Sequence, residues 1–123
     1  MPLSKPVPFS LVRAGDEQIS AWYDLNTHCR RDVLPEDPDI SLPSLLSRAK
    51  ALEGVQIIKE WAVWSTDNRK MLALGGIHAS KFGFNKGSAF FDIMTMRDHR
   101  RQGLGESFLG LIADTAKGHE WKF

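Results

Sequence analysis

Residues 89–117 constrain the fold of this chain more than any other part of the sequence. An apolar run at residues 89–96 is typical of a strand, and it leads into the basic turn 100–105, which holds two glycines. Apolar residues at helical spacing follow in residues 106–117. A glycine-containing turn at a helix start points several backbone N–H groups at one place, and the helix dipole adds to their attraction for an anion. The sequence therefore predicts a strand, a phosphate-binding turn and a helix, in that order.

The glycine spacing in this turn narrows its interpretation. The turn lacks both the Gly-Lys-Ser/Thr ending of a P-loop and the three glycines of a dinucleotide-binding fingerprint. It does fit the pattern Arg/Gln-x-x-Gly-x-Gly/Ala, with Arg100, Gly103 and Gly105 at the defined positions. With a strand before it and a helix after it, this motif resembles the acyl-CoA-binding turn of the GNAT family of N-acetyltransferases. The plainer alternative is a helix start with a charged loop.

The resemblance implies acetyl-CoA, or another acyl-CoA, as cofactor and assigns it two sets of contacts. In the family, the main chain at the end of the fourth strand pairs with the pantetheine arm, a role that falls on Met94, Thr95 and Met96. Ordinary core packing of the two methionines is compatible with that role. The turn and the helix start hold the pyrophosphate, and the residues that match them are Arg100, Arg101, Gln102, Gly103, Leu104, Gly105 and Glu106. No metal is expected, because no Cys/His cluster has metal-ligand spacing.

The periodicity of the whole chain predicts the element order β-α-α-β-β-β-α. This order indicates an α+β domain and resembles the three-layer GNAT acyltransferase fold. The pair Gly75-Gly76 inside a predicted strand indicates a bulge or a close backbone contact. The predicted strands are residues 9–12, 57–65, 71–79 and 89–96, and the predicted helices are residues 17–30, 41–54 and 106–117.

The same resemblance predicts that residues 1–123 form a single GNAT-like domain that lacks its C-terminal strands and helix. In the family, a fifth strand begins where Phe123 stands and splays from the fourth to make the cofactor slot. We therefore expect an uncovered strand edge and self-association, most simply as a dimer with residues 121–123 near the contact. A missing C-terminal half is the alternative partner for this edge.

An acetyltransferase needs a base to remove a proton from its amine acceptor, and Asp92 is the first candidate, with His78 as the alternative. Asp92 is the only carboxylate in the predicted cofactor strand, and burial in an apolar strand would raise its pKa. A structural carboxylate bonded to the backbone is the alternative interpretation. His78, near the end of the preceding strand, has an ordinary pKa close to neutral, although an exposed histidine at a strand end often has no such role.

The helix predicted at residues 17–30 borders the acceptor pocket in the family, which makes Tyr23 and His28 candidates to line it. The expected acceptor is a small-molecule or peptide amine. Cys29 follows His28 directly, but adjacent helical residues point in different directions, so covalent cysteine catalysis is not expected. Cys29 is interpreted as a small core residue.

Composition argues against several other classes of protein. A net charge of +1 is unlike that of a dedicated nucleic-acid binder, and no apolar run has the length of a membrane helix. A single cysteine fits a reducing compartment, so we expect a cytoplasmic location. The leading hypothesis is an N-acetyltransferase. Its rival is a non-catalytic acyl-CoA-binding or assembly module, such as the silent half of a tandem acetyltransferase.

Overall fold

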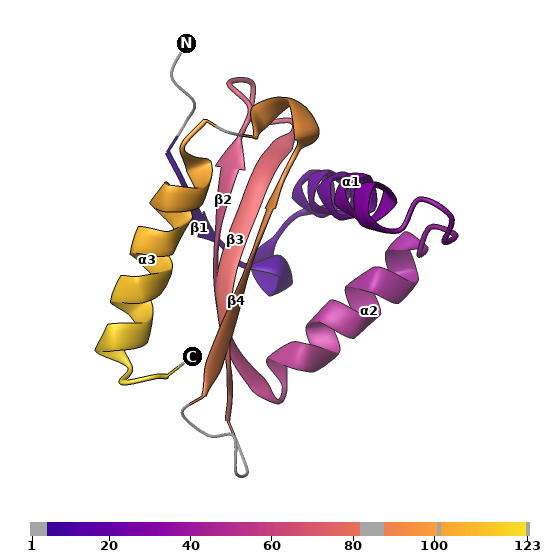
Figure 1. The fold of residues 1–123 in the computed structure, drawn as a ribbon. Coiled ribbons are helices and arrows are strands. Elements are labelled where there is room, and N and C mark those ends of the chain that lie inside the picture. Colours follow the sequence, from indigo (N-terminus) through magenta and orange to yellow (C-terminus); the bar gives the residue numbers. More distant parts are fainter. Residues whose placement is uncertain (1–4, 82–87, 101, 123) are drawn as a thin grey trace.

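An antiparallel sheet with helices on both faces forms the body of the protein (Figure 1). The computed structural model describes residues 5–81, 88–100 and 102–122, so Arg101 and Phe123 lie outside the described residues. The element order within the described residues is the predicted α+β order. The elements are β1 (Val7–Phe9), η1 (Leu11–Arg13), α1 (Asp16–Val33), α2 (Leu42–Glu53), β2 (Gln56–Trp64), β3 (Met71–Ser80), β4 (Ala89–Thr95), η2 (Arg97–His99) and α3 (Leu104–Gly118).

The strands lie in the sheet in the order in which they occur in the chain, β1-β2-β3-β4. Each strand is antiparallel to its neighbour. Among the described residues, β4 therefore has a neighbouring strand on one side only. Just before β4 begins, Ser88 makes an isolated parallel bridge to Lys122, and the N–H of Ala89, the first residue of β4, donates to the Lys122 carbonyl at 2.7 Å.

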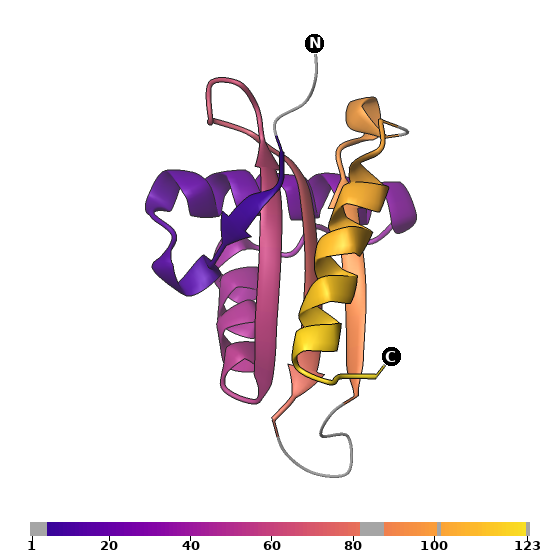
Figure 2. The same cartoon turned by 90° about the vertical axis from the view of Figure 1, so that its left-hand side faces the viewer.

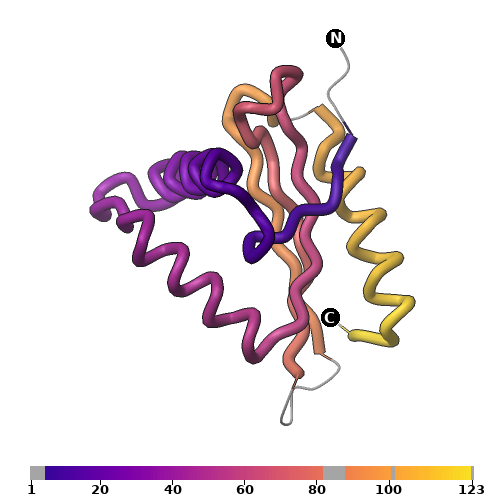
Figure 3. The backbone as a smooth tube through the Cα atoms, turned by 180° about the vertical axis from the view of Figure 1, so that it is seen from behind, coloured from indigo at the N-terminus to yellow at the C-terminus, as the bar shows by residue number. Residues whose placement is uncertain are grey.

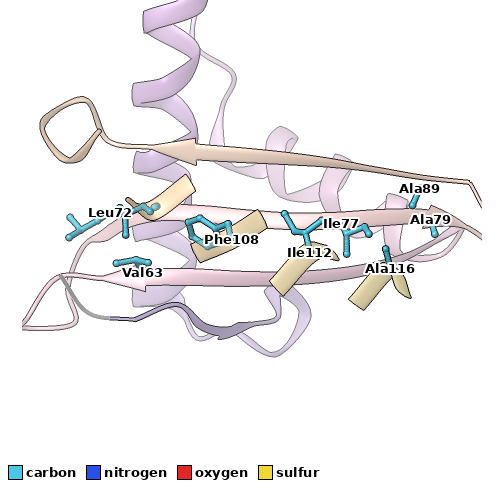
Figure 4. Close-up of a cluster of buried hydrophobic side chains, with 10 residues drawn as sticks. Val63, Leu72, Ile77, Ala79, Ala89, Phe108, Ile112 and Ala116 are labelled. Carbon is cyan, nitrogen blue, oxygen red and sulfur yellow. The ribbon is translucent and has the colours of Figure 1, made fainter. Parts of the chain in front are cut away.

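Helix α3 packs tightly against one face of the sheet (Figure 4). Phe108 is fully buried against Gly75, and a Cβ on that glycine would lie 2.5 Å from Phe108 Cδ1. The close backbone contact predicted for the glycine pair is thereby confirmed. The buried residues of this face are Val63, Leu72, Ala73, Ile77, Ala79, Ala89, Leu104, Phe108, Ile112 and Ala116.

Helices α1 and α2 cover the opposite face and pack more loosely (Figure 3). Trp22 and Leu25 of α1 are buried in a second core, but none of the twelve residues of α2 is buried. Ser41 caps α2 as its sequence position indicates, by accepting a hydrogen bond from the Ser44 N–H at 3.4 Å. Helix α1 crosses the strands, whereas α2 runs alongside β2 (Figure 2). The loose packing leaves room for cavities on this face.

Two boundaries near the N-terminus differ from the prediction. The strand predicted at residues 9–12 is wrong in position, because Val7 pairs with Ala62 and Phe9 with Glu60, which ends β1 at Phe9. Leu11 instead turns into the core within η1 and is only 4% exposed. Helix α1 also continues beyond the predicted range, to Val33.

Candidate functional site

The start of α3 presents backbone N–H groups beside open space. Gly103 is the N-cap, and its φ of +80° lies in the left-handed region that glycine adopts without strain. Gly103 has no side chain to cap the helix, so its first amides receive no hydrogen-bond acceptor from the N-cap position. A Cβ on Gly103 or Gly105 would meet no described atom within 4 Å. Leu104 anchors this end in the core, and Glu106 is exposed in the first turn. The arrangement can bind an anion.

Asp32 of α1 binds two arginines, Arg97 just before this turn and Arg100 at its first position. Its side chain is 12% exposed, and its carboxylate accepts hydrogen bonds from Arg97 and, at 2.8 Å, from Arg100 Nη2. Burial alone would raise the pKa of Asp32, but the two arginines outweigh it and lower that pKa below its usual value. His28 Nε2 accepts the Arg97 backbone N–H at 3.2 Å. Both Asp32 and His28 thus join α1 to the segment between β4 and α3.

Some main-chain groups at the end of β4 already make hydrogen bonds within the protein. The Met96 N–H donates to Leu72 at 2.8 Å, and the Met96 carbonyl accepts from His99 at 2.9 Å. Antiparallel pairing alternates between inward and outward main-chain groups, so Thr95 faces the outer edge of the sheet. Its carbonyl accepts from Arg100 Nε at 3.1 Å and from Cys29 Sγ at 3.6 Å. Met94, one of the three predicted pantetheine contacts, packs toward α1 and α2.

Three titratable side chains occupy neighbouring strands on the face beneath α1 and α2. Glu60 of β2 and Asp92 of β4 both pair with Gly76 of β3. A Cβ on Gly76 would lie 2.8 Å from Glu60 Cγ, so this glycine gives the glutamate room to lie over β3. His78 lies two residues along β3, with its Nε2 3.5 Å from Asp92 Oδ1.

The local environment shifts the pKa of two of these groups. Burial raises the pKa of Glu60 to about 7, because the charged carboxylate loses water. The pKa of His78 is also raised, mainly by its hydrogen bond to Asp92, although burial acts in the opposite direction. Glu60 therefore titrates near neutral pH, and the charged form of His78 is favoured beside it.

The burial expected for Asp92 is wrong. Its side chain is 68% exposed because β4 is an edge strand among the described residues, whereas the His78 side chain is only 19% exposed. Sequence reasoning missed Glu60, which follows Lys59 in a strand and reads as one more outward polar residue. The signal that could have identified it is Gly76 directly across the sheet, since a missing side chain there makes space for a neighbour.

Two adjoining cavities lie between these strands and the helices α1 and α2. Asn26 and Met94 line both of them. The first, of about 140 Å³, is lined by Leu11, Trp22, Asn26, Ala49, Leu52, Glu53, Ile58, Glu60, Leu74, His78, Asp92 and Met94. The second, of about 330 Å³ and mostly apolar, is lined by Asn26, Thr27, Cys29, Arg30, Val33, Leu34, Ile40, Leu45 and Met94.

The two predicted acceptor residues lie in a different cavity, of about 430 Å³. Tyr23 and His28 line it together with Met96. The Tyr23 hydroxyl donates to the Ile40 carbonyl at 2.7 Å, and so joins α1 to the segment before α2. The structure therefore brings Tyr23 and His28 together but separates them from the candidate bases His78 and Asp92.

Two kinds of feature are absent from the part of the chain that the structure describes. No helix there is long and apolar enough to cross a bilayer. No three His, Cys, Asp or Glu side chains there converge as ligands for a metal ion.

Solved structures share this arrangement, although no protein-family model and no curated protein matches the sequence. A tandem GNAT protein from the clavulanic acid biosynthesis pathway superposes on 95% of this chain with a TM-score of 0.71, at 16% sequence identity. The chain has the GNAT fold. The GNAT fold here also matches the ribosomal-protein-alanine N-acetyltransferase of Brucella melitensis over 87% of the chain, with a TM-score of 0.66 and 11% identity.

A third similar structure holds the cofactor that the sequence motif implies. The phosphinothricin acetyltransferase of Sinorhizobium meliloti, solved in complex with acetyl-CoA, matches 94% of the chain with a TM-score of 0.65 and 14% identity. The chain spans 34% of the tandem protein, 66% of the Brucella enzyme and 61% of the Sinorhizobium enzyme. At these identities the similarity establishes the fold.

Proposed function

We propose that the protein transfers an acetyl group from acetyl-CoA to an amine acceptor. The observation that carries this proposal is the uncapped start of α3, which faces open space at Gly103 and Gly105 beside the edge strand β4. Helix N-termini of this kind bind phosphate through their amides and dipole. The resemblance of the motif to the GNAT acyl-CoA-binding turn implies that this end of the helix binds the pyrophosphate.

The proposed cofactor contacts divide between amides and a strand edge. The amides of residues 102–106 bind the pyrophosphate, and Arg101 joins them on the basis of the motif alone. Arg100 shapes the turn, since its guanidinium already binds Asp32 and Thr95. The outward main chain at Thr95 pairs with the pantetheine arm, beside Met94.

Bound acetyl-CoA would supply a thioester: the amine nitrogen would bond to its carbonyl carbon, the C–S bond would break, and the proton that the nitrogen loses would go to the thiolate. His78 is the proposed base that first takes a proton from the ammonium form of the acceptor. Asp92 orients the His78 ring and favours its protonated form through their 3.5 Å contact. Burial raises the pKa of Cys29 and so keeps its thiol protonated, which agrees with direct transfer rather than a covalent enzyme intermediate.

Release of free CoA thiol with a panel of amines tests this function. Wild-type protein should release thiol only when an amine is present. His78→Gln should lower kcat by a factor on the order of 10² to 10⁴, and the exposed control His119→Gln should leave it unchanged. Acetyl-CoA binding without thiol release from any amine would favour the non-catalytic acyl-CoA-binding module instead.

A cytoplasmic location and self-association belong to the same proposal. The single cysteine fits a reducing compartment, where acetyl-CoA is also available. The edge of β4 has hydrogen-bonding groups that a second copy could use. Sedimentation at micromolar concentration should give a dimer, and a strictly monomeric chain would contradict the proposed self-association alone.

A further inference from the structure

We propose that the acceptor is an amphipathic primary monoamine. Its ammonium group binds in the cavity at Glu60, His78 and Asp92, and its apolar body fills the adjoining pocket between α1 and α2. This inference rests on the proposed acetyl transfer and names the chemical class of its acceptor.

The smaller cavity holds more acidic than basic side chains. Its lining holds three carboxylates, Glu53, Glu60 and Asp92, against a single histidine, and it includes no lysine or arginine among the described residues. Even with His78 protonated, the ionised cavity keeps a negative charge. The Glu60 side chain lies over β3 and is only partly exposed, so a bound cation would stabilise its charged form, which burial disfavours.

Gly76 sets the shape of this cavity. Since Glu60 Cγ occupies the space that a side chain at position 76 would take, the glutamate lies over β3 instead of projecting along β2. The adjacent strands then bring His78 and Asp92 to the same space from the other side. A volume of about 140 Å³ holds an ammonium group with a few carbons, and the described residues do not converge as metal ligands.

The larger pocket supplies the apolar part of the site. Its lining is mostly hydrophobic, and two of its large apolar side chains are left in water, with Val33 76% exposed and Leu34 43% exposed. A ligand body that covers them gains the free energy of burying apolar surface. Arg30, which lies 3.7 Å from Asp37, also lines this pocket and repels a second ammonium group. A monoamine therefore fits the pair of cavities better than a polyamine does.

Asn26 and Met94 line both cavities, so a ligand that occupies both passes between these two side chains. Met94 has a flexible thioether side chain that adapts to the shape of its neighbours. It also belongs to β4, the strand proposed to hold the pantetheine arm. An amine with its head among Glu60, His78 and Asp92 is thus held next to the proposed acyl donor.

Calorimetry with the full chain and no acetyl-CoA measures amine binding apart from catalysis. The probes are phenethylamine, ethylamine and spermidine, and phenethylamine should bind at least about tenfold more tightly than either of the others. Glu60→Gln should weaken phenethylamine binding about tenfold, because it removes a charge-assisted contact while keeping the shape of the side chain. The matched control, Glu36→Gln in the exposed segment before α2, should bind like wild type.

Two further measurements test the binding of the ammonium group and of the apolar body separately. Val33→Asn, at the exposed mouth of the apolar pocket, should weaken phenethylamine several-fold and leave ethylamine unchanged. At pH 7, phenethylamine binding should release protons from wild type, measured in buffers of different ionisation enthalpy, because a nearby ammonium favours the charged form of Glu60. His78, Asp92 and Glu53 face Glu60, so Glu60→Gln should reduce the release without removing a His78 contribution.

Equal phenethylamine affinities for folded wild type and Glu60→Gln would overturn the proposed site, as would tighter binding of spermidine. Asp92→Asn provides a second charge-removing variant if Glu60→Gln does not fold. The thiol-release assay reports on the parent function independently. Thiol release with hydrophilic amines alone refutes this inference but leaves acetyl transfer standing, whereas amine binding in the expected pattern without any thiol release refutes acetyl transfer.

Discussion

The two faces of the sheet are built differently. On the α3 face, Phe108 and Ile112 are almost completely buried, and Gly75 lets the Phe108 ring approach the backbone of β3. On the other face, α2 has no buried residue, and cavities with titratable side chains lie under it. Two adjacent glycines leave space on opposite faces of the sheet. The Phe108 ring occupies the space beside Gly75, and the Glu60 side chain occupies the space beside Gly76. The first face holds the sheet together, and the second offers space and charge for a ligand.

The largest contrast expected between the faces is in stability. Ile112→Ala should lower the free energy of unfolding by about 2 to 5 kcal/mol, because it leaves a cavity in a close-packed core. Leu52→Ala, which removes a side chain of the same size from α2 where it is 44% exposed, should cost less than about 1 kcal/mol. Urea denaturation of both variants measures the two values. Similar losses would remove the distinction between a packed face and a loose one.

The pH dependence of stability should report on Glu60 and His78, the titratable side chains on the face under α1 and α2. Folded Glu60 keeps its proton up to pH about 7, whereas the unfolded chain releases it near the ordinary value of 4.5, so the free energy of unfolding falls as pH rises between these values. The raised pKa of His78 has the same sign, since the stability it gives below pH 6.5 is lost as pH passes its folded pKa.

Glu60→Gln should therefore reduce this fall by about 2 kcal/mol, somewhat less than the full pKa shift implies because the side chain is only partly buried. Denaturation midpoints between pH 4.5 and 8 give the measurement, with Glu36→Gln as the exposed control. A variant whose stability falls as steeply as that of wild type would show that Glu60 is not the group responsible.

A smaller effect is expected from the contact between α1 and the turn before α3. Asp32→Asn should weaken acetyl-CoA binding about threefold to tenfold, because Arg97 and Arg100 lose the carboxylate that positions them. The control Asp39→Asn breaks an exposed pair with Arg31, which leaves the contacts of Arg97 and Arg100 intact, and should have no effect. Tighter binding to Asp32→Asn would mean that the free charge of the arginines matters more than their position.

The sequence predicted the packed face better than the face with the cavities, for a physical reason. Apolar periodicity located α3 and strands β2 to β4, and the pair Gly75-Gly76 indicated a close contact, because these signals are local or depend only on size. The burial of Asp92 was predicted wrongly, since whether a strand lies at an edge depends on the topology of the whole sheet.

Glu60 is the reverse case, because its partial burial could not be predicted from the sequence. Its neighbours in the sequence give no sign that it is withdrawn from water, and only the register that places Gly76 across from it reveals the space it enters. His28 likewise has the helix position expected of a pocket residue, yet its ring nitrogen binds the Arg97 backbone. Contacts between residues this far apart in the chain follow from the three-dimensional fold and not from local pattern.

Acetyl-CoA binding to Gly105 variants tests the central claim most directly, namely that the start of α3 binds the pyrophosphate of an acyl-CoA. Gly105 is the better position to change, because Gly103 needs a left-handed backbone and a Cβ on Gly105 meets no described atom within 4 Å. Gly105→Asp and Gly105→Asn have nearly the same size, and an acidic residue in the first turn stabilises a helix, so both should fold. Calorimetry should show acetyl-CoA binding to wild type and at least about tenfold weaker binding to Gly105→Asp than to Gly105→Asn. Equal affinity of the two folded variants would contradict the claim.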